Sequence, residues 1–389
     1  MGEAKFSSQR ALAHIQKLAV EIGSRPAGSD TEKRAAEYIR GELAADGYAT
    51  SLQEFPITSI TDEGTNLQVL SPQERSIDAK ALGGSVSDAA EGELIAAGIG
   101  RPEDFGSDAR GKIALIQRGE ITFGAKVANA QAAGTAGVLV YNNQAGNFTG
   151  NLTSGSAIPA ASISKEDGES LLSASGQPVR VRLEVKTQTE TLTSRNVVAR
   201  PPDGNCNIVA GGHYDSVPAG PGANDNGSGT AVVIEMARTR AAAGELANIC
   251  YVLFGSEEIG LVGSAVYVAS LADDDRAALK AMLNFDMLAV GDSWPFAGSP
   301  EVNAVADREA TKLGLPHSVS AELPQNLGSD HASFIRAGIP SVIFNCFCDA
   351  HYHTAQDTID YVQESRLGDA GNIGLAMIDD LLQPSPSGS

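Results

Sequence analysis

Apolar residues recur at helical spacing over residues 7–46 at the amino end of the chain. A glycine- and proline-containing segment at residues 23–28 interrupts this pattern, and Gly47 ends it, so two helices are expected. Ser29 and Glu32 have the spacing of a capping box, which places the start of the second helix at this point.

The middle of the chain changes to strand signals and then to a composition rich in Gly, Ala, Ser and Asp. Residues 51–57 and 67–70 alternate or cluster apolar positions, which predicts strands. Three further elements are predicted: a buried strand at residues 111–119, a helix of small residues at 123–133 and a second strand at 137–143. This pattern favours a smaller α/β domain inserted at residues 71–188.

Strands and helices alternate from residue 196 onward. The expected elements are strands at residues 208–211, 248–254, 281–285 and 341–344, and a helix at 228–243. This alternation indicates an α/β fold with a mostly parallel-centred mixed sheet flanked by helices. A chain of 389 residues is too long for one ordinary core. We therefore predict a large domain from residues 1–70 and 189–383, followed by a disordered tail at 384–389.

The charge balance limits the classes of partner. Lysine and arginine total 28 against 48 acidic residues, which gives a net charge of −20. Such a chain is repelled by nucleic acid and by anionic lipid, so neither partner is expected. A peptide with a free, cationic amino terminus is compatible with this charge. No apolar run approaches the roughly 18 to 20 residues that cross a bilayer.

The four cysteines are too few for a disulfide scaffold in a chain of this size. Cys206 and Cys250 open two strands that are expected to be neighbours, so a bond between them is one alternative. Cys346 and Cys348 are one residue apart, and a bond between them would be strained. The other alternative is four buried thiols.

Six residues with metal-binding or proton-accepting side chains lie where a predicted strand gives way to a loop. They are His213, Asp225, Glu257, Glu258, Asp286 and His353. The carboxyl ends of parallel strands meet at one edge of a sheet, which is where ligands bind in such folds. Imidazole and carboxylate without thiolate suit zinc, and less exclusively manganese or cobalt. The pattern predicts a hydrolytic site with two metal ions.

Each of these residues also has a structural interpretation. A single histidine such as His213 is more often structural than a ligand, but Asp215 is placed to accept its second ring proton, as an outer carboxylate does for a metal-bound histidine. Asp225 precedes a helix and has the position of an N-cap. Its carboxylate has two oxygens, however, and is therefore the candidate for a ligand that bridges two ions.

The adjacent Glu257 and Glu258 would ordinarily form a solvated acidic turn. Here they follow the apolar strand at residues 250–254, and adjacent carboxylates repel unless a cation or a proton relieves them. Asp286 ends another apolar strand, and only Lys280 is close to it in sequence as a partner for a salt bridge. Together with the loop aspartate, these residues bring four negative charges, which two divalent ions would neutralise.

The motifs around these residues resemble those of the zinc aminopeptidases of the aminopeptidase S and aminopeptidase Y type. The matching stretches are residues 222–229, 255–264, 284–287, 329–334 and 352–354. The resemblance extends over residues 5–60 and 195–380. The strand, Arg-Gly turn, alanine-rich helix and following strand of the middle segment resemble the protease-associated domain, which many of these enzymes carry as an insert.

The resemblance implies a role for each residue of the site. His213 and Asp286 would hold one of two Zn²⁺ ions, Glu258 and His353 would hold the other, and Asp225 would bridge them. Glu257 would be the general base, and Tyr352 matches a residue that in some members donates to the oxyanion. Supporting roles around the ligands fall to Asp215, Asp330 and Asp357. The resemblance also implies a secreted enzyme that acts on peptides with a free amino terminus, with cobalt or manganese as possible substitutes for zinc. The sequence leaves the oligomeric state open, and a monomer is favoured.

Three related classes of protein are alternatives. Receptor-like homologues have lost metal ligands, but none of the expected ligands is missing here. Glutaminyl cyclases use one zinc ion, whereas His213 would serve a second. Carboxypeptidases of the glutamate carboxypeptidase type need basic groups for the terminal carboxylate, and only Arg238 and Arg336 lie near the motifs. The side-chain preference of an aminopeptidase cannot be read from the sequence, because loops form the walls of the pocket.

Overall fold

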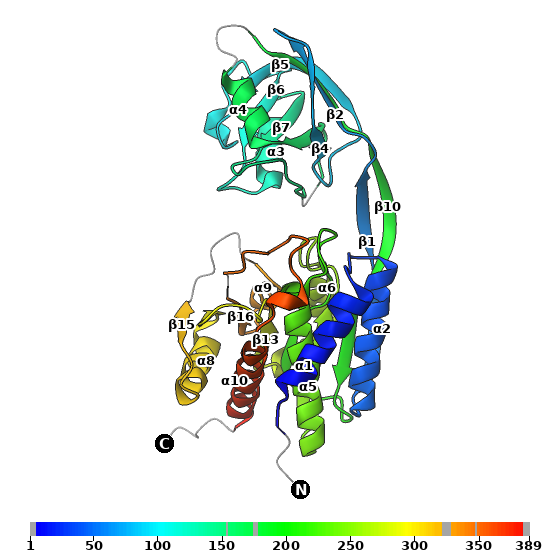
Figure 1. Ribbon diagram of the computed structural model, residues 1–389, viewed down its shortest axis with the longest axis vertical. Coiled ribbons are helices and arrows are strands. Elements are labelled where there is room, and N and C mark those ends of the chain that lie inside the picture. The colour runs from blue at the N-terminus through cyan, green and yellow to red at the C-terminus, as the bar shows by residue number, and fades with distance from the viewer. Residues whose placement is uncertain (1–4, 153–154, 174–177, 321–327, 347, 384–389) are drawn as a thin grey trace. The chain divides into compact units, whose positions relative to one another are not determined.

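The computed structural model describes residues 5–152, 155–173, 178–320, 328–346 and 348–383. It divides into two compact units, one made of Met1–Ile57 with Leu192–Ser389 and the other of Thr58–Thr191 (Figure 1). The sequence predicts the insert at residues 71–188, so the second unit begins earlier in the chain than expected. The tail at residues 384–389, for which disorder is predicted, lies outside the described residues.

Long strands carry the chain through both boundaries between the units. The first boundary lies within β1 (Ala49–Asp62) and the second within β10 (Thr187–Arg200). These two strands are neighbours at one edge of the sheet of the first unit. Because secondary structure continues through each boundary, the sequence contains no break that would mark it.

An eight-stranded mixed sheet organises the first unit, in the order β1-β10-β12-β11-β13-β16-β14-β15. The six strands after β10 are β11 (Cys206–His213), β12 (Asn248–Phe254), β13 (Ala281–Phe285), β14 (Trp294–Gly298), β15 (His317–Ser320) and β16 (Ser341–Phe344). The central strands β12, β11, β13 and β16 are mutually parallel, whereas β10 and β14 run antiparallel to their central neighbours. The predicted fold class is confirmed.

The strand register brings the carboxyl ends of the central strands to the same level. His213 is opposite Phe254 in the neighbouring strand, and Phe285 is opposite Phe344. Loops that leave these four ends therefore begin side by side, which is the arrangement needed to collect side chains from distant parts of the sequence.

Helices cover both faces of this sheet (Figure 1). They are α1 (Ser8–Ile15) with its π-helical continuation η1 (Gln16–Ile22), α2 (Asp30–Ala45), α5 (Gly229–Ala243), α6 (Val262–Ser270), α7 (Asp273–Ala278), α8 (Pro300–Lys312), α9 (His331–Arg336) and α10 (Glu364–Leu382). Side chains of α1, α2, α5, α8 and α10 form one buried cluster, and those of α6 and α9 belong to another. Among the described helices, none has the length and apolar character required to cross a membrane.

The two helices predicted at the amino end are present, with Gly47 following the second at a φ of 93°. The capping box is only half formed. Ser29 Oγ accepts a hydrogen bond from the main-chain N–H of Glu32 at 3.1 Å, as expected. The Glu32 carboxylate accepts instead from the N–H of Gly28 at 2.9 Å and from the hydroxyl of Ser194. Glu32 is buried, and its side chain points into the core instead of back toward the main-chain N–H of the N-cap residue Ser29.

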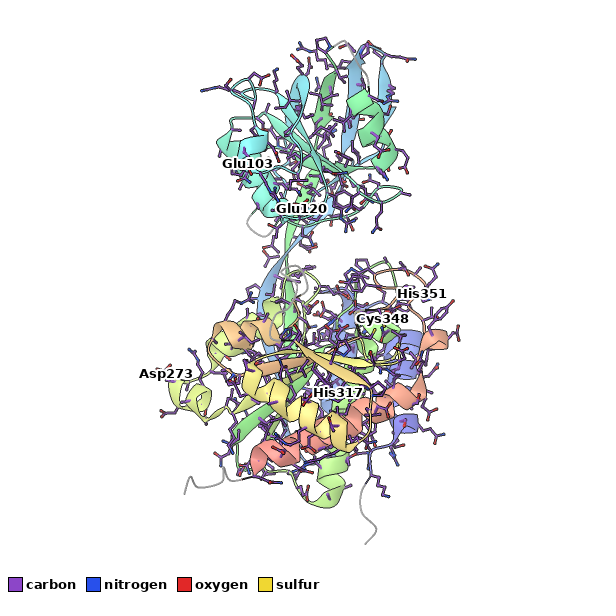
Figure 2. All side chains as sticks on the ribbon, turned by 90° about the vertical axis from the view of Figure 1, so that its left-hand side faces the viewer. Glu103, Glu120, Asp273, His317, Cys348 and His351 are labelled. Atoms are coloured by element: carbon purple, nitrogen blue, oxygen red, sulfur yellow. A yellow bond between two sulfur atoms is a disulfide. The ribbon has the colours of Figure 1, made fainter. Side chains whose placement is uncertain are left out.

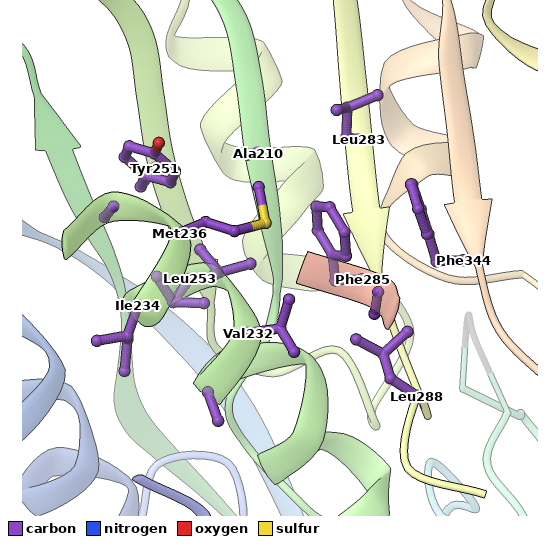
Figure 3. Close-up of a cluster of buried hydrophobic side chains, with 14 of the residues drawn as sticks. Ala210, Val232, Ile234, Met236, Tyr251, Leu253, Leu283, Phe285, Leu288 and Phe344 are labelled. Atoms are coloured by element: carbon purple, nitrogen blue, oxygen red, sulfur yellow. The ribbon is translucent and has the colours of Figure 1, made fainter. Parts of the chain in front are cut away.

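A close helix-to-sheet contact occurs in the main core of the first unit, part of which Figure 3 shows. The rings of Phe285 and Phe344 stack with their centroids 4.4 Å apart. Gly374 of α10 approaches this pair so closely that an added Cβ would lie 2.8 Å from Phe285 Cζ and 2.9 Å from Met236 Sδ. Only glycine therefore allows α10 to approach the sheet at this distance.

A disulfide joins Cys206 at the start of β11 to Cys250 in β12. The structure thus has the first of the two alternatives that the sequence leaves open. Cys346 and Cys348 are not bonded, and the first is buried whereas the second is exposed. The disulfide lies toward the amino ends of two strands whose carboxyl ends carry candidate site residues.

The second unit is a smaller α/β structure with a sheet of its own. Its strand order is β3-β2-β9-β5-β6-β7-β8-β4. The elements are β2 (Asn66–Ser71), β3 (Arg75–Ile77), β4 (Ala79–Ala81), β5 (Ala89–Ala96), η2 (Pro102–Asp104), β6 (Ile113–Gln117), α3 (Phe123–Ala132), β7 (Gly137–Tyr141), β8 (Ala160–Ile163), α4 (Lys165–Ser173) and β9 (Arg180–Glu184). The predicted strand, helix and strand correspond to β6, α3 and β7. None of the six candidate site residues lies in this unit.

The close packing of α10 leads to a stability prediction. Gly374→Ala should lower the free energy of unfolding by about 1 to 3 kcal/mol, because the added methyl group has no room beside Phe285. Gly41→Ala is the matched control, since this glycine lies in α2 and nothing stands within 4 Å of its added Cβ. The control should leave stability unchanged or raise it by up to about 1 kcal/mol. Thermal unfolding that shows no loss for Gly374→Ala relative to the control would contradict the packing described.

Candidate metal centre

All six candidate residues lie at the carboxyl edge of the central parallel strands. His213 is the last residue of β11, the two glutamates follow β12, and Asp286 directly follows β13. His353 lies in the loop after β16, and Asp225 lies in η3 (Ala223–Ser228), which leads into α5. The strand ends thus bring together residues that are far apart in the sequence.

The first cluster of ligand atoms consists of His213, Asp225 and Asp286. His213 Nε2 is 3.2 Å from Asp225 Oδ1 and 3.4 Å from Asp286 Oδ1. One ligand atom from each of the three residues lies within 4.8 Å of the others, and all three residues are buried. Asp286 Oδ1 has no hydrogen-bond partner among the described residues, which leaves this buried oxygen available to a cation.

The second cluster consists of Asp225, Glu258 and His353. His353 Nε2 is 3.2 Å from Asp225 Oδ2 and 2.9 Å from Glu258 Oε2. The three ligand atoms again lie within 4.8 Å of one another. Asp225 is common to both clusters and turns a different oxygen toward each histidine. This is the arrangement that a carboxylate needs in order to bridge two ions.

Glu257 belongs to neither cluster although it is adjacent to Glu258. Its Oε2 lies 4.0 Å from His213 Nε2, and its side chain lines the same pocket as the ligand atoms. The side chain of Glu258 is fixed on two sides, since its Oε1 also accepts a hydrogen bond from the N–H of Val217 at 3.2 Å. The two neighbouring carboxylates therefore have different surroundings and can have different roles.

Without a bound metal ion, protons on the site residues balance the negative charge of the carboxylates. Burial raises the pKa of Glu258 to about 7, and the neighbouring charge of Asp225 acts in the same direction. Burial opposes the protonation of His353, but hydrogen bonds with Asp225 and Glu258 outweigh it and raise the pKa of His353 to about 10. The pKa of His213 is raised for similar reasons, against its own burial, by Glu257 and Asp286. A set of carboxylates that retains protons on its histidines fits divalent cations, which can replace those protons.

Left-handed backbone conformations occur at three non-glycine residues that belong to the six candidates or directly adjoin one of them. The φ values are 61° at Ser256, 55° at Met287 and 59° at His353. Residues other than glycine rarely adopt this region, and they keep it where the surrounding structure holds them, as at functional sites. The loops turn sharply at these points, which directs consecutive side chains into one pocket.

Asp215 lies beside the site, but its contacts differ from those expected. The Nδ1 atom of His213 hydrogen-bonds the main-chain carbonyl oxygen of Asp215 at 3.1 Å, whereas the carboxylate oxygen is 3.6 Å away. The two carboxylate oxygens accept instead from the N–H groups of Glu257 and Glu258, at 3.1 and 3.3 Å. Asp215 therefore orients the histidine through its backbone and the two glutamates through its side chain.

Asp357 and Asp330 have different surroundings. The oxygens of Asp357 accept from the N–H groups of Asn224 and Asp225, at 2.7 and 3.0 Å, so this carboxylate holds the loop that carries the shared aspartate. Asp330 is fully buried at the start of α9, and burial raises its pKa to about 7. It is not part of the pocket wall, which in this region consists of Gly328 and Ser329.

Tyr352 lines the pocket with a partly exposed ring. The ring stacks on that of His353, with centroids 3.7 Å apart and an angle of 22° between the planes. This contact restricts the orientation of the histidine ring.

Arg25 is a supporting residue that the sequence does not predict. Its guanidinium is completely buried and donates to five main-chain carbonyl oxygens, those of Leu18, Gly23, Tyr214, Pro221 and Gly222. It thereby ties the amino-terminal helices to the loop between His213 and Asp225. The only sequence signal is an arginine in the short Gly-Ser-Arg-Pro break between two helices.

Asn224 and Asn226 form a second unanticipated support. Asn226 Oδ1 accepts from the N–H of Gly229 at 2.8 Å and of Met287 at 3.3 Å, and Asn224 Oδ1 accepts from that of Ala289 at 2.8 Å. Their amides therefore hold the loop after Asp286 against the loop of Asp225. Asparagines in a glycine-rich loop are also typical of turns, so the sequence does not distinguish this role.

The pocket at the two clusters has a cavity volume of about 160 Å³. The described part of its wall contains no lysine or arginine. Arg238 pairs with Glu235 within α5 at 2.7 Å, and Arg336 donates to Ser333 in α9.

Comparisons with known proteins identify the family of this chain. The model of peptidase family M28 matches residues 196–378, and that of the PA domain matches residues 82–171. The chain is 36% identical over 405 residues to the aminopeptidase YwaD of Bacillus subtilis (strain 168), with 97% of this chain and 85% of that protein covered.

Solved structures show the same similarity. An aminopeptidase from Aneurinibacillus sp. strain AM-1 superposes with a TM-score of 0.85 at 30% identity, covering 98% of this chain and 95% of that one. A zinc aminopeptidase from Bacillus subtilis gives a TM-score of 0.78 at 33% identity, covering 97% and 96%. The agreement in sequence and fold extends over nearly the whole of each chain, insert included. The chain therefore belongs to peptidase family M28, as its motifs suggest, and carries a PA domain within the peptidase fold.

Proposed function

We propose that this chain, a metal-dependent aminopeptidase, holds two zinc ions through the two clusters of ligand atoms that share Asp225. The observation that carries the proposal is the division of the Asp225 carboxylate, with one oxygen 3.2 Å from His213 Nε2 and the other 3.2 Å from His353 Nε2. Each cluster offers one histidine and one further carboxylate, a donor set that suits zinc. A relative of known structure is itself described as a zinc aminopeptidase.

Bound zinc would supply Lewis-acid activation of a water molecule and of the scissile carbonyl group. Glu257 is the residue that accepts the proton of this water and passes it to the leaving amine. Its carboxylate lines the pocket but lies outside both clusters, which supports a role in proton transfer rather than in holding an ion. The N–H groups of Glu257 and Glu258 are both fixed by Asp215, so the base has a defined position.

The substrate is a peptide with a free amino terminus. Glu257 and Asp286 line the pocket and offer carboxylate oxygens to its ammonium group. The carboxypeptidase alternative is weaker, because the described pocket wall lacks the basic side chains that a terminal carboxylate would need. Tyr352 also lines the pocket and is the candidate donor to the oxygen on which charge develops.

An extracellular location is part of the proposal. The bond between Cys206 and Cys250 supports it, because disulfides persist in oxidising compartments and are rare in the cytosol. A monomer is proposed as the working form, and both clusters of ligand atoms are complete without a residue from a second chain.

Removal of metal should abolish hydrolysis of amino-acid anilides, and zinc or cobalt should restore it. Near pH 7, zinc loading should also release protons, because the raised pKa values of His213 and His353 keep both imidazoles protonated until ligation makes them neutral. Calorimetric titration of metal-free protein in buffers of different ionisation enthalpy measures this release. Full activity in protein shown to be free of metal would refute the proposal.

The adjacent glutamates provide a matched pair of variants. Glu257→Gln should retain two zinc ions per chain while turnover falls by at least about a hundredfold, because an amide cannot accept the proton of the water. Glu258→Gln should instead bind less zinc, since it replaces a ligand. Elemental analysis after dialysis measures the zinc content of each variant, and this value together with kcat distinguishes the two variants. The reverse pattern would exchange the two assigned roles.

Blocking the amino terminus tests the direction of cleavage. N-acetylation of a leucine anilide should reduce kcat/KM at least about a hundredfold, or roughly 2.7 kcal/mol, because it removes the charge that the carboxylates bind and adds bulk. The control is the same anilide with a free amine. Efficient cleavage of an N-acetylated dipeptide with a free carboxylate, and none of the leucine anilide, would establish the carboxypeptidase alternative.

A further inference from the structure

One carboxylate of the pocket wall has no part in either cluster of ligand atoms or in proton transfer. Asp349 lies in the loop after β16, four residues before His353, and its side chain lines the pocket. Figure 2 labels Cys348 and His351, which stand on either side of this residue in the loop, at one edge of the first unit. Apart from Glu257 and the ligands, Asp349 is the only acidic residue in the described pocket wall.

Neutral groups hold the Asp349 carboxylate in place. Oδ2 accepts a hydrogen bond from the side-chain amide of Asn224 at 2.7 Å, and Oδ1 accepts from the main-chain N–H of His351 at 2.7 Å. Asn224 is itself fixed, because its Oδ1 accepts from the N–H of Ala289 at 2.8 Å. Both donors to Asp349 are uncharged, so the carboxylate is oriented but its negative charge remains. A carboxylate oxygen can accept further hydrogen bonds beyond these two.

The surroundings of Asp349 suit a long side chain with a cationic end. Met287 and Ile343 are buried and form apolar parts of the pocket wall, whereas Asp349 is only partly buried. Lysine and arginine combine an apolar stem with a charged head in the same way, and each places the stem against apolar surface and the head toward a polar rim. The net charge of −20 adds a long-range attraction for a cationic substrate.

We propose that Asp349 binds the cationic side chain of the first residue of the substrate and gives the enzyme a preference for peptides that begin with arginine or lysine. The inference rests on the proposed aminopeptidase function, and it names the class of substrate. The ammonium of the amino terminus is bound by Glu257 and Asp286, next to the reacting groups, so Asp349 is available to the side chain. Met287 and Ile343 contact its methylene groups.

Anilides of arginine and citrulline test this proposal, because the two side chains have nearly the same shape and only that of arginine is charged. The zinc-loaded enzyme should hydrolyse the arginine anilide with a kcat/KM roughly tenfold to a hundredfold higher, the range expected of one charge-assisted hydrogen bond. In Asp349→Asn the ratio of arginine to citrulline should fall close to one. General damage to the site lowers kcat/KM for both substrates and leaves the ratio of the two values unchanged. The ratio therefore reports only the effect of the charge on the substrate side chain.

Two further variants make the outcome decisive. Asp349→Ser also removes the charge but keeps a small acceptor, and it avoids placing an amide donor against Asn224, so it should lower the ratio as Asp349→Asn does. Asp360→Asn removes the same charge at an exposed position outside the pocket wall, and should leave the ratio unchanged. Zinc content and thermal unfolding show whether each variant is folded and loaded.

Two results would overturn the proposal. They are a ratio near one in the unaltered enzyme, or a ratio that both Asp349 variants retain. If the Asp349 variants lost kcat/KM equally for the arginine, citrulline and leucine anilides, Asp349 would instead bind the amino terminus of the substrate or hold the loop in place. If the zinc-loaded enzyme hydrolysed none of the three, the aminopeptidase function itself would be wrong, which is a different outcome from hydrolysis without preference.

Discussion

Mutual repulsion among buried carboxylates is the constraint on which the structure of this site depends. Asp225, Glu257 and Asp286 line one pocket, and Glu258 lies beside it against His353, so the four carboxylates are close together where little water can screen them. Such a group of like charges persists only where rigid elements hold it and where protons or cations balance it. The parallel strands provide the rigidity, because each residue lies at a strand end or in the loop that follows. The two histidines provide the protons that metal ions can replace.

The surrounding structure fixes these charges without cancelling them. The carboxylates of Asp215 and Asp357 accept main-chain N–H groups of the site loops, and the buried guanidinium of Arg25 donates to main-chain carbonyl oxygens. A salt bridge from Arg25 to a ligand would have neutralised the charge that a metal ion needs. Backbone contacts instead position the loops and leave the ligand oxygens facing the pocket. Asn224 extends this principle to Asp349, which it orients with an uncharged amide.

The sequence predicts most of the fold and the side chains that gather at one edge of the sheet, because both follow from where apolar strands end. His213 and Asp286 stand directly at such ends, and the prediction that parallel strands bring them together agrees with the geometry. The contacts of Asp215 could not be predicted, since they depend on which of its oxygens faces the histidine ring. The partners of Arg25 are distant in the sequence, and no local pattern encodes them. The second compact unit begins at Thr58 rather than at residue 71, and a strand runs through this boundary, so no break in the sequence marks it.

The position of the insert between β1 and β10 has a consequence for how the chain folds. These neighbouring strands would form a simple hairpin if a short turn joined them, but an entire domain separates them instead. An unfolded segment of that length would cost roughly 3 kcal/mol more to close than a short turn, because loop-closure entropy grows with the logarithm of loop length. Once the domain has folded, its two ends are held and it acts as the turn of the hairpin. The edge of the peptidase sheet is therefore expected to form late, after a domain that contributes no ligand to the metal site.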